Sequence, residues 1–283
     1  MRINTNVNSL NAQESANVTG SKLKSSLEKL SSGLAINKAS DDASGLSIAD
    51  KLRTQASSLG QSISNGNSAS ALTQIADKAM GEQSNILDVI KQKLLQASTA
   101  TTSTEGRNAI AKDINKLLDQ VNNIATQTNY NGQTLLQASH DGKSSTTALT
   151  FQMGELAADV ITTTGAVMAN TSGLTLTSLK DTVAAGGITQ SSASTMLAGI
   201  DTALDTLNSW RSDFGSTQNQ IESSIRNMST AQTNISAAES VIRDVDYAAE
   251  SANFNKQNII SQAGTYAMSQ ANSLQQNVMR LLQ

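Results

Sequence analysis

Few residues of this chain form a pattern that is suited to catalysis or metal binding. The one histidine is His140, in the Ser- and Gly-rich stretch ASHDGKSS, and cysteine is absent. Zinc sites need several His, Cys or carboxylate ligands at short spacing, and one loop histidine is poor support for a Ser-His-Asp triad. The sequence also lacks HExxH and CxxC motifs. We therefore predict no catalytic residue, no metal site and no cofactor.

The adjacent carboxylates Asp41 and Asp42, followed by Gly45, are the other candidate for chemistry, as a calcium site or an acid–base pair. No neighbouring residues complete a calcium ligand set. Asp side chains cap the backbone amides at a helix start, and glycine relaxes the backbone in a turn. We interpret these three residues as a turn at which a new helix begins.

Apolar residues at steps of three and four flank this turn on both sides. Leu23, Leu27 and Leu30 precede it, and Ile48 and Leu52 follow it. This spacing places the apolar side chains on one face of a helix. Similar stripes predict long helices over residues 107–127, 196–243 and 253–281.

The composition favours long helices packed side by side. Aromatic residues make up 2% of the 283 residues, hydrophobic residues 38%, and proline is absent. Aliphatic side chains must therefore supply the core, as in helix bundles and coiled coils, and no proline interrupts a helix. The net charge of −3 and pI of about 5.2 argue against a nucleic-acid binder. No apolar run reaches the roughly 18 residues of a membrane span, so we predict no membrane insertion.

The middle of the chain has a different pattern. TNYNGQTLL contains an Asn-Gly pair, which is typical of a tight hairpin turn. ALTFQMG and DVITTTGAVM are rich in β-branched residues and punctuated by glycine, as short strands are. The predicted fold class is mainly α: a long helical coiled-coil or rod bundle formed by both ends of the chain, with a small β-hairpin-rich central insert.

The two terminal segments, residues 1–34 and 253–283, carry apolar stripes but are otherwise rich in Asn, Gln, Ser and Ala. Amphipathic segments of this kind are marginal as isolated helices, and they become ordered when partners cover their apolar faces. We predict that these partners include copies of the same chain. The predicted subunit interface consists of Val7, Leu10, Leu23, Leu27, Leu30, Ile260, Ala267, Leu274, Val278, Leu281 and Leu282.

Five stretches of the chain resemble bacterial flagellin. They are MRINTNVNSLNAQ, LSSGLAINKASDDASGLSIADKL, TNYNGQTLL, AAESVIRDVDYAAESANFNKQNIISQAGTYAMSQAN and LQQNVMRLL. The resemblance covers about residues 1–155 and 195–283 and leaves only the middle unmatched. It implies a structural subunit, not an enzyme, that self-polymerises into the flagellar filament used for swimming.

The resemblance also implies how the chain is divided. Residues 1–40 and 250–283 become the terminal coiled coil of the filament core, and residues 41–139 and 191–249 become the helical rod domain. Residues 140–190 remain as a small β-rich surface insert. The turn at Asp41, Asp42 and Gly45 is similar to the spoke of the family, a bent link between the two helical layers.

The localisation and partners are likewise implied by the resemblance. The polar start of the chain lacks the apolar core of a signal peptide, which by itself favours the cytoplasm. Flagellins instead leave the cell by the flagellar type III route without a cleaved signal peptide, so we expect an extracellular filament protein. The expected partners are further copies of the chain, the flagellar export apparatus, an export chaperone, the filament cap and the hook–filament junction proteins.

Three alternatives belong to other classes. A hook–filament junction protein has flagellin-like ends and is the nearest one. A flagellin with a metalloprotease insert is a second, but the short insert here lacks HExxH. A membrane-inserting helical toxin is a third, and it disagrees with the scarcity of Lys, Arg, Trp and Phe on the helices.

One departure from the family concerns immune recognition. Many flagellins carry an Arg-Val-Arg-Glu-Leu-like run that resembles the recognised site for an innate immune receptor. The aligned stretch here is DVIKQKLLQ, which places Val89 and Lys91 at the two arginines and Gln92 at the glutamate. Valine cannot replace the planar donor fork of arginine. We predict a degenerate receptor surface at these three residues and weak agonism.

Overall fold

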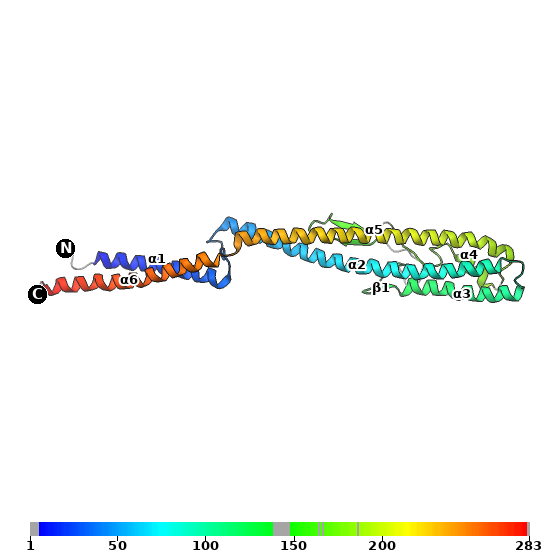
Figure 1. Ribbon diagram of the computed structural model, residues 1–283, viewed down its shortest axis with the longest axis horizontal. Helices are drawn as coiled ribbons and strands as arrows, with labels where there is room; N and C mark the ends of the chain where they lie inside the picture. The colour runs from blue at the N-terminus through cyan, green and yellow to red at the C-terminus, as the bar shows by residue number, and fades with distance from the viewer. Residues whose placement is uncertain (1–5, 138–147, 164, 166, 186, 282–283) are drawn as a thin grey trace. The chain divides into compact units, whose positions relative to one another are not determined.

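The structure is a computed structural model that describes residues 6–137, 148–163, 165, 167–185 and 187–281. The side chains at 275 and 277–281 are not among those described, and His140 and Leu282 lie outside the described residues. In chain order the elements are α1 (Val7–Ser32), α2 (Ala43–Ala97), α3 (Thr104–Gln127), β1 (Asn129–Tyr130), β2 (Gln133–Thr134), β3 (Thr150–Gln152), β4 (Val160–Thr162), α4 (Thr177–Ala184), α5 (Gln190–Arg243) and α6 (Tyr247–Leu281). The mainly α fold with short β-hairpins is confirmed (Figure 1).

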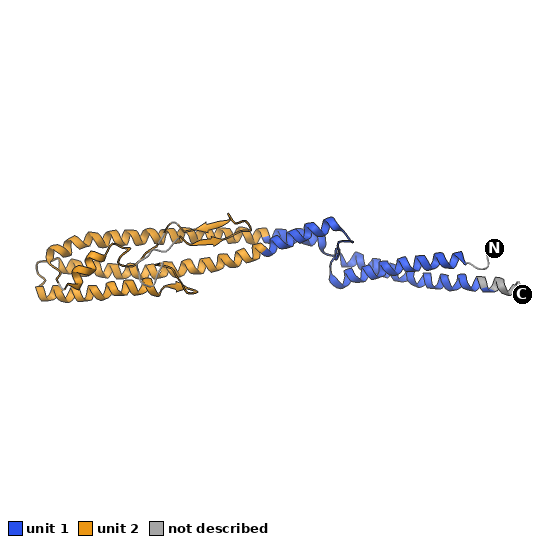
Figure 2. Ribbon diagram, turned by 180° about the vertical axis from the view of Figure 1, so that it is seen from behind, with its two compact units in different colours: residues 1–57, 232–283 blue, residues 58–231 orange. Residues whose placement is uncertain are grey.

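The chain forms two compact units (Figure 2). Unit 1 comprises residues 1–57 and 232–283, and unit 2 comprises residues 58–231. Both long helices, α2 and α5, contribute residues to each unit. The family resemblance instead implies boundaries at 40/41 and 249/250. Those boundaries separate layers of the filament, and they stay a prediction.

Unit 2 is a helical bundle held by one main apolar core. The stripe that predicts helix α3 is buried: Ile114, Leu118 and Val121 are fully covered. They pack in a cluster with residues of α2 and α5 that recur at helical spacing, so each helix turns one apolar face inward. Core members of α2 and α5 include Leu87, Ile90, Leu94, Ile200, Leu207 and Phe214.

Two short antiparallel hairpins complete unit 2. In the first, Tyr130 of β1 pairs with Gln133 of β2. In the second, Phe151 of β3 pairs with Ile161 of β4, and Ile161 packs in a smaller apolar cluster with Ile221 of α5. Both hairpins lie where the sequence predicts them. The structure adds α4, an eight-residue helix whose Leu179 and Val183 enter the core.

A buried glutamine fastens the loop before α4 to the bundle. Gln83 of α2 is fully buried, and its Nε2 donates to the carbonyl oxygens of Val121, at 3.0 Å, and Ala169, at 2.7 Å. Asn122 accepts hydrogen bonds from both the backbone amide and the hydroxyl of Thr171. Buried hydrogen bonds of this kind hold a segment in one position, although the Oε1 of Gln83 is itself buried without a hydrogen-bond partner among the described residues. The central insert therefore packs as part of unit 2.

Candidate assembly surface

In unit 1 the two terminal helices, α1 and α6, lie side by side and run antiparallel (Figure 1). Near one end of the pair, Asn6 Nδ2 donates to the carbonyl oxygen of Ala271 at 3.1 Å. Near the other end, the Tyr247 hydroxyl donates to the carbonyl oxygen of Leu30 at 3.1 Å. The first and last described segments of the chain are therefore each other's neighbours.

The faces by which α1 and α6 pair are lined mainly by small or polar side chains. Their covered positions alternate at steps of three and four, the spacing of a coiled-coil seam. We call these residues the paired faces: Ser9, Ala12, Ala16, Thr19, Leu23, Ser26 and Leu30 on α1, and Phe254, Gln257, Ser261, Gly264, Met268 and Ala271 on α6. Because nine of these thirteen residues are small or polar, the pairing buries less apolar area than a leucine-rich seam of the same length would.

Most of the large apolar side chains of these two helices point away from the paired faces. We call them the exposed apolar set: Val7, Leu10, Val18 and Leu27 on α1, and Ile259, Ile260, Tyr266 and Leu274 on α6. Ile260, Ala267 and Leu274 recur every seven residues and form one line along α6. Leu274, for example, exposes 57% of its surface. Contiguous exposed apolar surface marks interaction sites, so these helices present a candidate assembly surface.

The residues predicted as subunit interface thus divide into two groups. Leu23 and Leu30 lie in the paired faces, where α6 covers them partly. Val7, Leu10, Leu27, Ile260, Ala267 and Leu274 are exposed and available to other chains. The side chains of Val278 and Leu281 are not described. Sequence reasoning missed Val18, Ile259 and Tyr266, because they fall outside the stripes.

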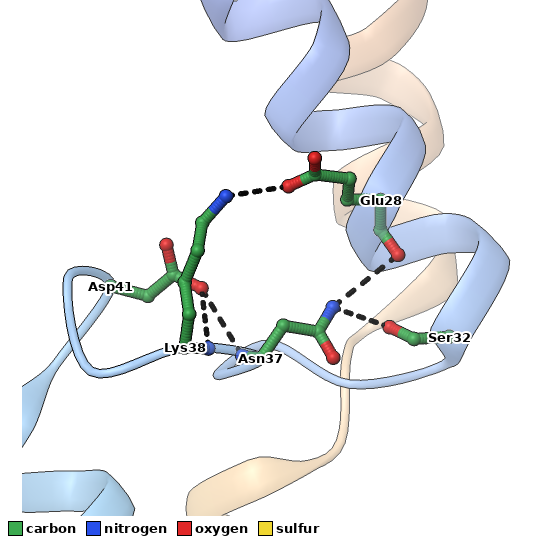
Figure 3. Close-up of polar contacts among 5 residues, drawn as sticks. All are labelled: Glu28, Ser32, Asn37, Lys38 and Asp41. Carbon is green, nitrogen blue, oxygen red and sulfur yellow. Dashed lines mark hydrogen bonds and ion pairs between the residues drawn. The ribbon is translucent and has the colours of Figure 1, made fainter.

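The connection between α1 and α2 is tied back to the end of α1 (Figure 3). Asp41 Oδ2 accepts hydrogen bonds from the backbone amides of Asn37 and Lys38 at 3.1 and 3.2 Å. Asn37 Nδ2 donates to Ser32 Oγ at 2.6 Å, and Lys38 Nζ pairs with Glu28 Oε2 at 2.7 Å. The hydrogen bond from Lys38, with its positive charge, lowers the pKa of Glu28. These bonds give the connection a defined shape.

Asp42 starts α2. Its Oδ1 accepts from the backbone amides of Ser44 and Gly45, both at 3.0 Å, which is the geometry of an N-cap. A Cβ at position 45 would lie 2.5 Å from Asp42 Oδ2 and 2.8 Å from Ile36 Cδ1, so a larger residue there would force the capping carboxylate and Ile36 to shift. The carboxylates of the predicted spoke turn, Asp41 and Asp42, therefore accept hydrogen bonds from backbone amides of the turn and of the start of α2. Their role between filament layers stays a prediction.

The α1–α2 connection also pairs with the α5–α6 connection. Gly33 ends α1 in the left-handed region at φ 75°, as C-cap glycines do. Its carbonyl oxygen then accepts from the Val245 amide at 3.0 Å, and the Ala35 amide donates to Arg243 at 2.7 Å. These two bonds flank a bridge between Leu34 and Asp244. No sequence pattern pointed to this pairing.

The cap leads to a local prediction. Asp42→Ala removes the acceptor for two amides and should destabilise the first turn of α2 by about 1 kcal/mol, which makes exchange of the Ser44 and Gly45 amides about fivefold faster. Hydrogen exchange of the monomer measures this. Asp42→Asn keeps an acceptor and should stay close to wild type. Equal exchange in Asp42→Ala and wild type would contradict the capping role.

Two of the three residues of the predicted receptor surface are exposed. Val89 and Gln92 lie one turn apart on α2 and are both open to solvent. Lys91 points elsewhere, because its Nζ pairs with Asp201 of α5. The hydrogen bond to Asp201 also raises the pKa of Lys91. The structure thus leaves Val89 and Gln92 as the open part of this surface.

Over the described residues, no group of three or more His, Cys, Asp and Glu side chains is placed to hold a metal ion. None of the helices in that part of the chain is long and apolar enough to cross a membrane. Several polar side chains of unit 1, such as Asn37, Asp41 and Asp42, instead cap a helix or join the segments around the α1–α2 connection.

The fold is that of a mainly helical protein whose paired terminal helices expose large apolar side chains. Residues 3–141 match the bacterial flagellin N-terminal helical region, and residues 197–282 match the bacterial flagellin C-terminal helical region. The chain belongs to the bacterial flagellin family.

Individual relatives agree. The chain is 33% identical to the flagellin of Bacillus subtilis (strain 168) over an alignment that covers all of both proteins. It is 50% identical to flagellin A of Helicobacter felis over 160 residues, which are 56% of this chain but only 30% of that protein. A putative flagellar hook-associated protein from Vibrio parahaemolyticus shares the fold, with a TM-score of 0.60 at 12% identity over 71% of this chain and 99% of that one.

Proposed function

We propose that this protein is the structural subunit that self-polymerises into the bacterial flagellar filament for swimming motility. The observation that carries the proposal is the exposed apolar set on α1 and α6, which the paired faces leave uncovered. The similarity to the Bacillus subtilis flagellin over the whole chain supports it. As a filament subunit the protein has no catalytic activity and uses no cofactor.

Other copies of the chain are the best-suited occupants of this surface. The line of Ile260, Ala267 and Leu274 and the exposed Val7 and Leu10 are aliphatic or small, so two such helices pack closely. Burying one large aliphatic side chain contributes about 1.5–3 kcal/mol. A subunit that covers several of them therefore adds stabilisation that the α1–α6 pair alone leaves unused.

We further propose that the subunit acts outside the cell after export through the flagellar type III apparatus, delivered by an export chaperone. A terminal helix pair held mainly by small or polar side chains unfolds at lower cost than a leucine-rich pair, which suits passage through a narrow channel. The filament cap and hook–filament junction proteins are the remaining proposed partners. In the filament, residues 1–40 and 250–283 form the terminal coiled coil, and the turn at Asp41, Asp42 and Gly45 forms the spoke. The rod domain consists of residues 41–139 and 191–249, which include parts of both units.

A hook–filament junction protein is the alternative. The fold alone does not separate the two, because a hook-associated protein shares it. The full-length similarity to a flagellin favours the filament subunit. Abundance distinguishes them: a filament subunit is the main protein of a sheared filament preparation, and a junction protein is a trace component.

Seeded assembly tests the function directly. Purified monomer mixed with short filament fragments of the same protein should elongate them, as seen by negative-stain electron microscopy. Monomer without fragments is the control and should assemble more slowly, because it must nucleate. Fragments that stay short after prolonged incubation would contradict the proposal.

The receptor surface allows a second measurement. Losing one central arginine anchor costs on the order of 2 kcal/mol, about thirtyfold in affinity, so the wild-type monomer should be a weak agonist in reporter cells. Val89→Arg with Gln92→Glu should raise the signal. Ile75→Arg with Gln74→Glu is a matched control on α2, since Ile75 and Val89 each expose 41% of their surface. Equal signals from the two variants would contradict the proposed surface.

A further inference from the structure

The turn of the first hairpin carries an Asn-Gly pair with an exposed, left-handed backbone. Asn131 has φ 52° and Gly132 has φ 82°, as in a two-residue type I′ turn. Both residues are exposed. Among the described residues, no hydrogen bond engages the Gly132 amide or the Asn131 side chain. Glycine has no side chain to shield its own amide nitrogen.

We propose that Asn131 is a site of spontaneous deamidation. The Gly132 nitrogen loses its proton and attacks the side-chain carbonyl carbon of Asn131, forming a carbon–nitrogen bond. The bond from that carbon to the amide nitrogen breaks, and ammonia leaves with the proton. Water then opens the resulting five-membered imide at either carbonyl, which gives aspartate or isoaspartate. The net reaction consumes one water and releases one ammonia, with no oxidation or reduction.

The same chain contains a second Asn-Gly pair that the fold protects. Asn65 and Gly66 lie inside α2, where the Gly66 amide belongs to the helical hydrogen-bond ladder. The Asn65 side chain accepts from Gln61 Nε2 at 3.0 Å and donates to the Gln152 carbonyl oxygen at 3.5 Å. Gly66 is buried, and a Cβ there would lie 2.8 Å from Met153 Cε and from Ile225 Cγ1. Imide formation at this position requires local unfolding of the helix.

The turn at Asn131 opens far more easily. Each strand of its hairpin has two residues, and short two-stranded hairpins are marginal in stability. The attack needs only that the turn leaves its left-handed conformation for a moment. Hairpin tips open at a small fraction of the free energy that a packed helix requires.

The two products have different consequences. Aspartate adds a negative charge but tolerates the left-handed conformation, so the turn remains. Isoaspartate routes the backbone through the side-chain carbon and lengthens the turn by one atom, which disturbs the pairing of Tyr130 with Gln133. Leu135 and Leu136 follow directly and are fully buried in unit 2. Isoaspartate at position 131 therefore loosens the end of the hairpin that leads into the core.

The experiment compares the two sites in one molecule. Purified full-length protein is incubated in mildly alkaline buffer, folded and in denaturant, and digested. Peptide masses report the acid forms, and protein isoaspartyl methyltransferase labels isoaspartate. In the folded protein, conversion at Asn131 should exceed that at Asn65 by at least about tenfold, and in denaturant the two sites should convert at similar rates.

Variants at position 131 test whether the isoaspartate arises at this turn. Asn131→Gly keeps a residue that adopts positive φ but has no side-chain amide, so it should abolish isoaspartate at this turn. Asn131→Asp should keep the hairpin and give no ammonia from the site. Equal conversion at Asn131 and Asn65 in the folded protein would overturn the proposal, as would an unchanged Asn131 in the folded protein while the denatured chain converts.

Discussion

Removal of residues 272–283 is expected to yield a monomer that keeps the helices of unit 2 but no longer forms filaments. The deletion takes away Leu274, an exposed member of the line along α6, and the end of the terminal helix. Unit 2 ends at residue 231 and loses nothing. Circular dichroism should show most of the helix retained, and electron microscopy with filament fragments should show no elongation.

The deletion shortens both the exposed apolar line on α6 and the α1–α6 pair. A point variant separates the loss of assembly from the loss of this pairing. Ile260→Gln with Leu274→Gln changes only exposed positions and leaves the paired faces intact. Two lost burials of about 1.5 kcal/mol each should raise the critical concentration for polymerisation on the order of a hundredfold. Asn255→Gln with Asn272→Gln is the matched control on exposed positions of the same helix. An unchanged critical concentration in the first variant would rule out this line as an assembly surface.

Phe214→Ala should have the largest effect on the stability of the monomer. Phe214 exposes 1% of its surface and packs in the main core of unit 2. Replacing a buried phenylalanine by alanine leaves a cavity and costs about 3–5 kcal/mol. Urea unfolding followed by the fluorescence of Trp210, the one tryptophan and a neighbour of this core, measures the loss.

Tyr266→Ala is the control for this measurement. This substitution removes a comparable ring from α6, but Tyr266 exposes 75% of its surface in the monomer. Surface substitutions usually change stability by less than about 0.5 kcal/mol. If Phe214→Ala and Tyr266→Ala shift the urea midpoint equally, the position of Phe214 in the core is wrong.

The long helices were predictable because their apolar residues keep a helical period. The stripes over residues 107–127, 196–243 and 253–281 correspond to α3, α5 and α6, each of which begins a few residues earlier in the structure. The short helix α4 was not predicted. Its eight residues include only two core side chains, Leu179 and Val183, too few to show a period.

The candidate site was only partly predictable. The sequence pointed to α1 and α6 as assembly helices and to Asp42 as a capping residue. It could not show which face of each helix pairs within the chain, because positions such as Ser9, Ala16 and Gly264 are too small to appear in a hydrophobic pattern. The bridge between Leu34 and Asp244 joins segments from opposite ends of the chain, and local sequence does not encode such a pairing.

The nested order of the two units has a consequence for protein synthesis. Unit 2 is one uninterrupted stretch, residues 58–231, so the ribosome delivers all of it before α6 begins at Tyr247. Helix α1 is translated before unit 2, yet its partner α6 is translated after it. A polypeptide that terminates early can complete unit 2 but leaves α1 without a partner. Pairing of α1 with α6 thus reports that translation has passed the whole of unit 2 and α6, and a product that stops between them stays distinguishable from one that contains both helices.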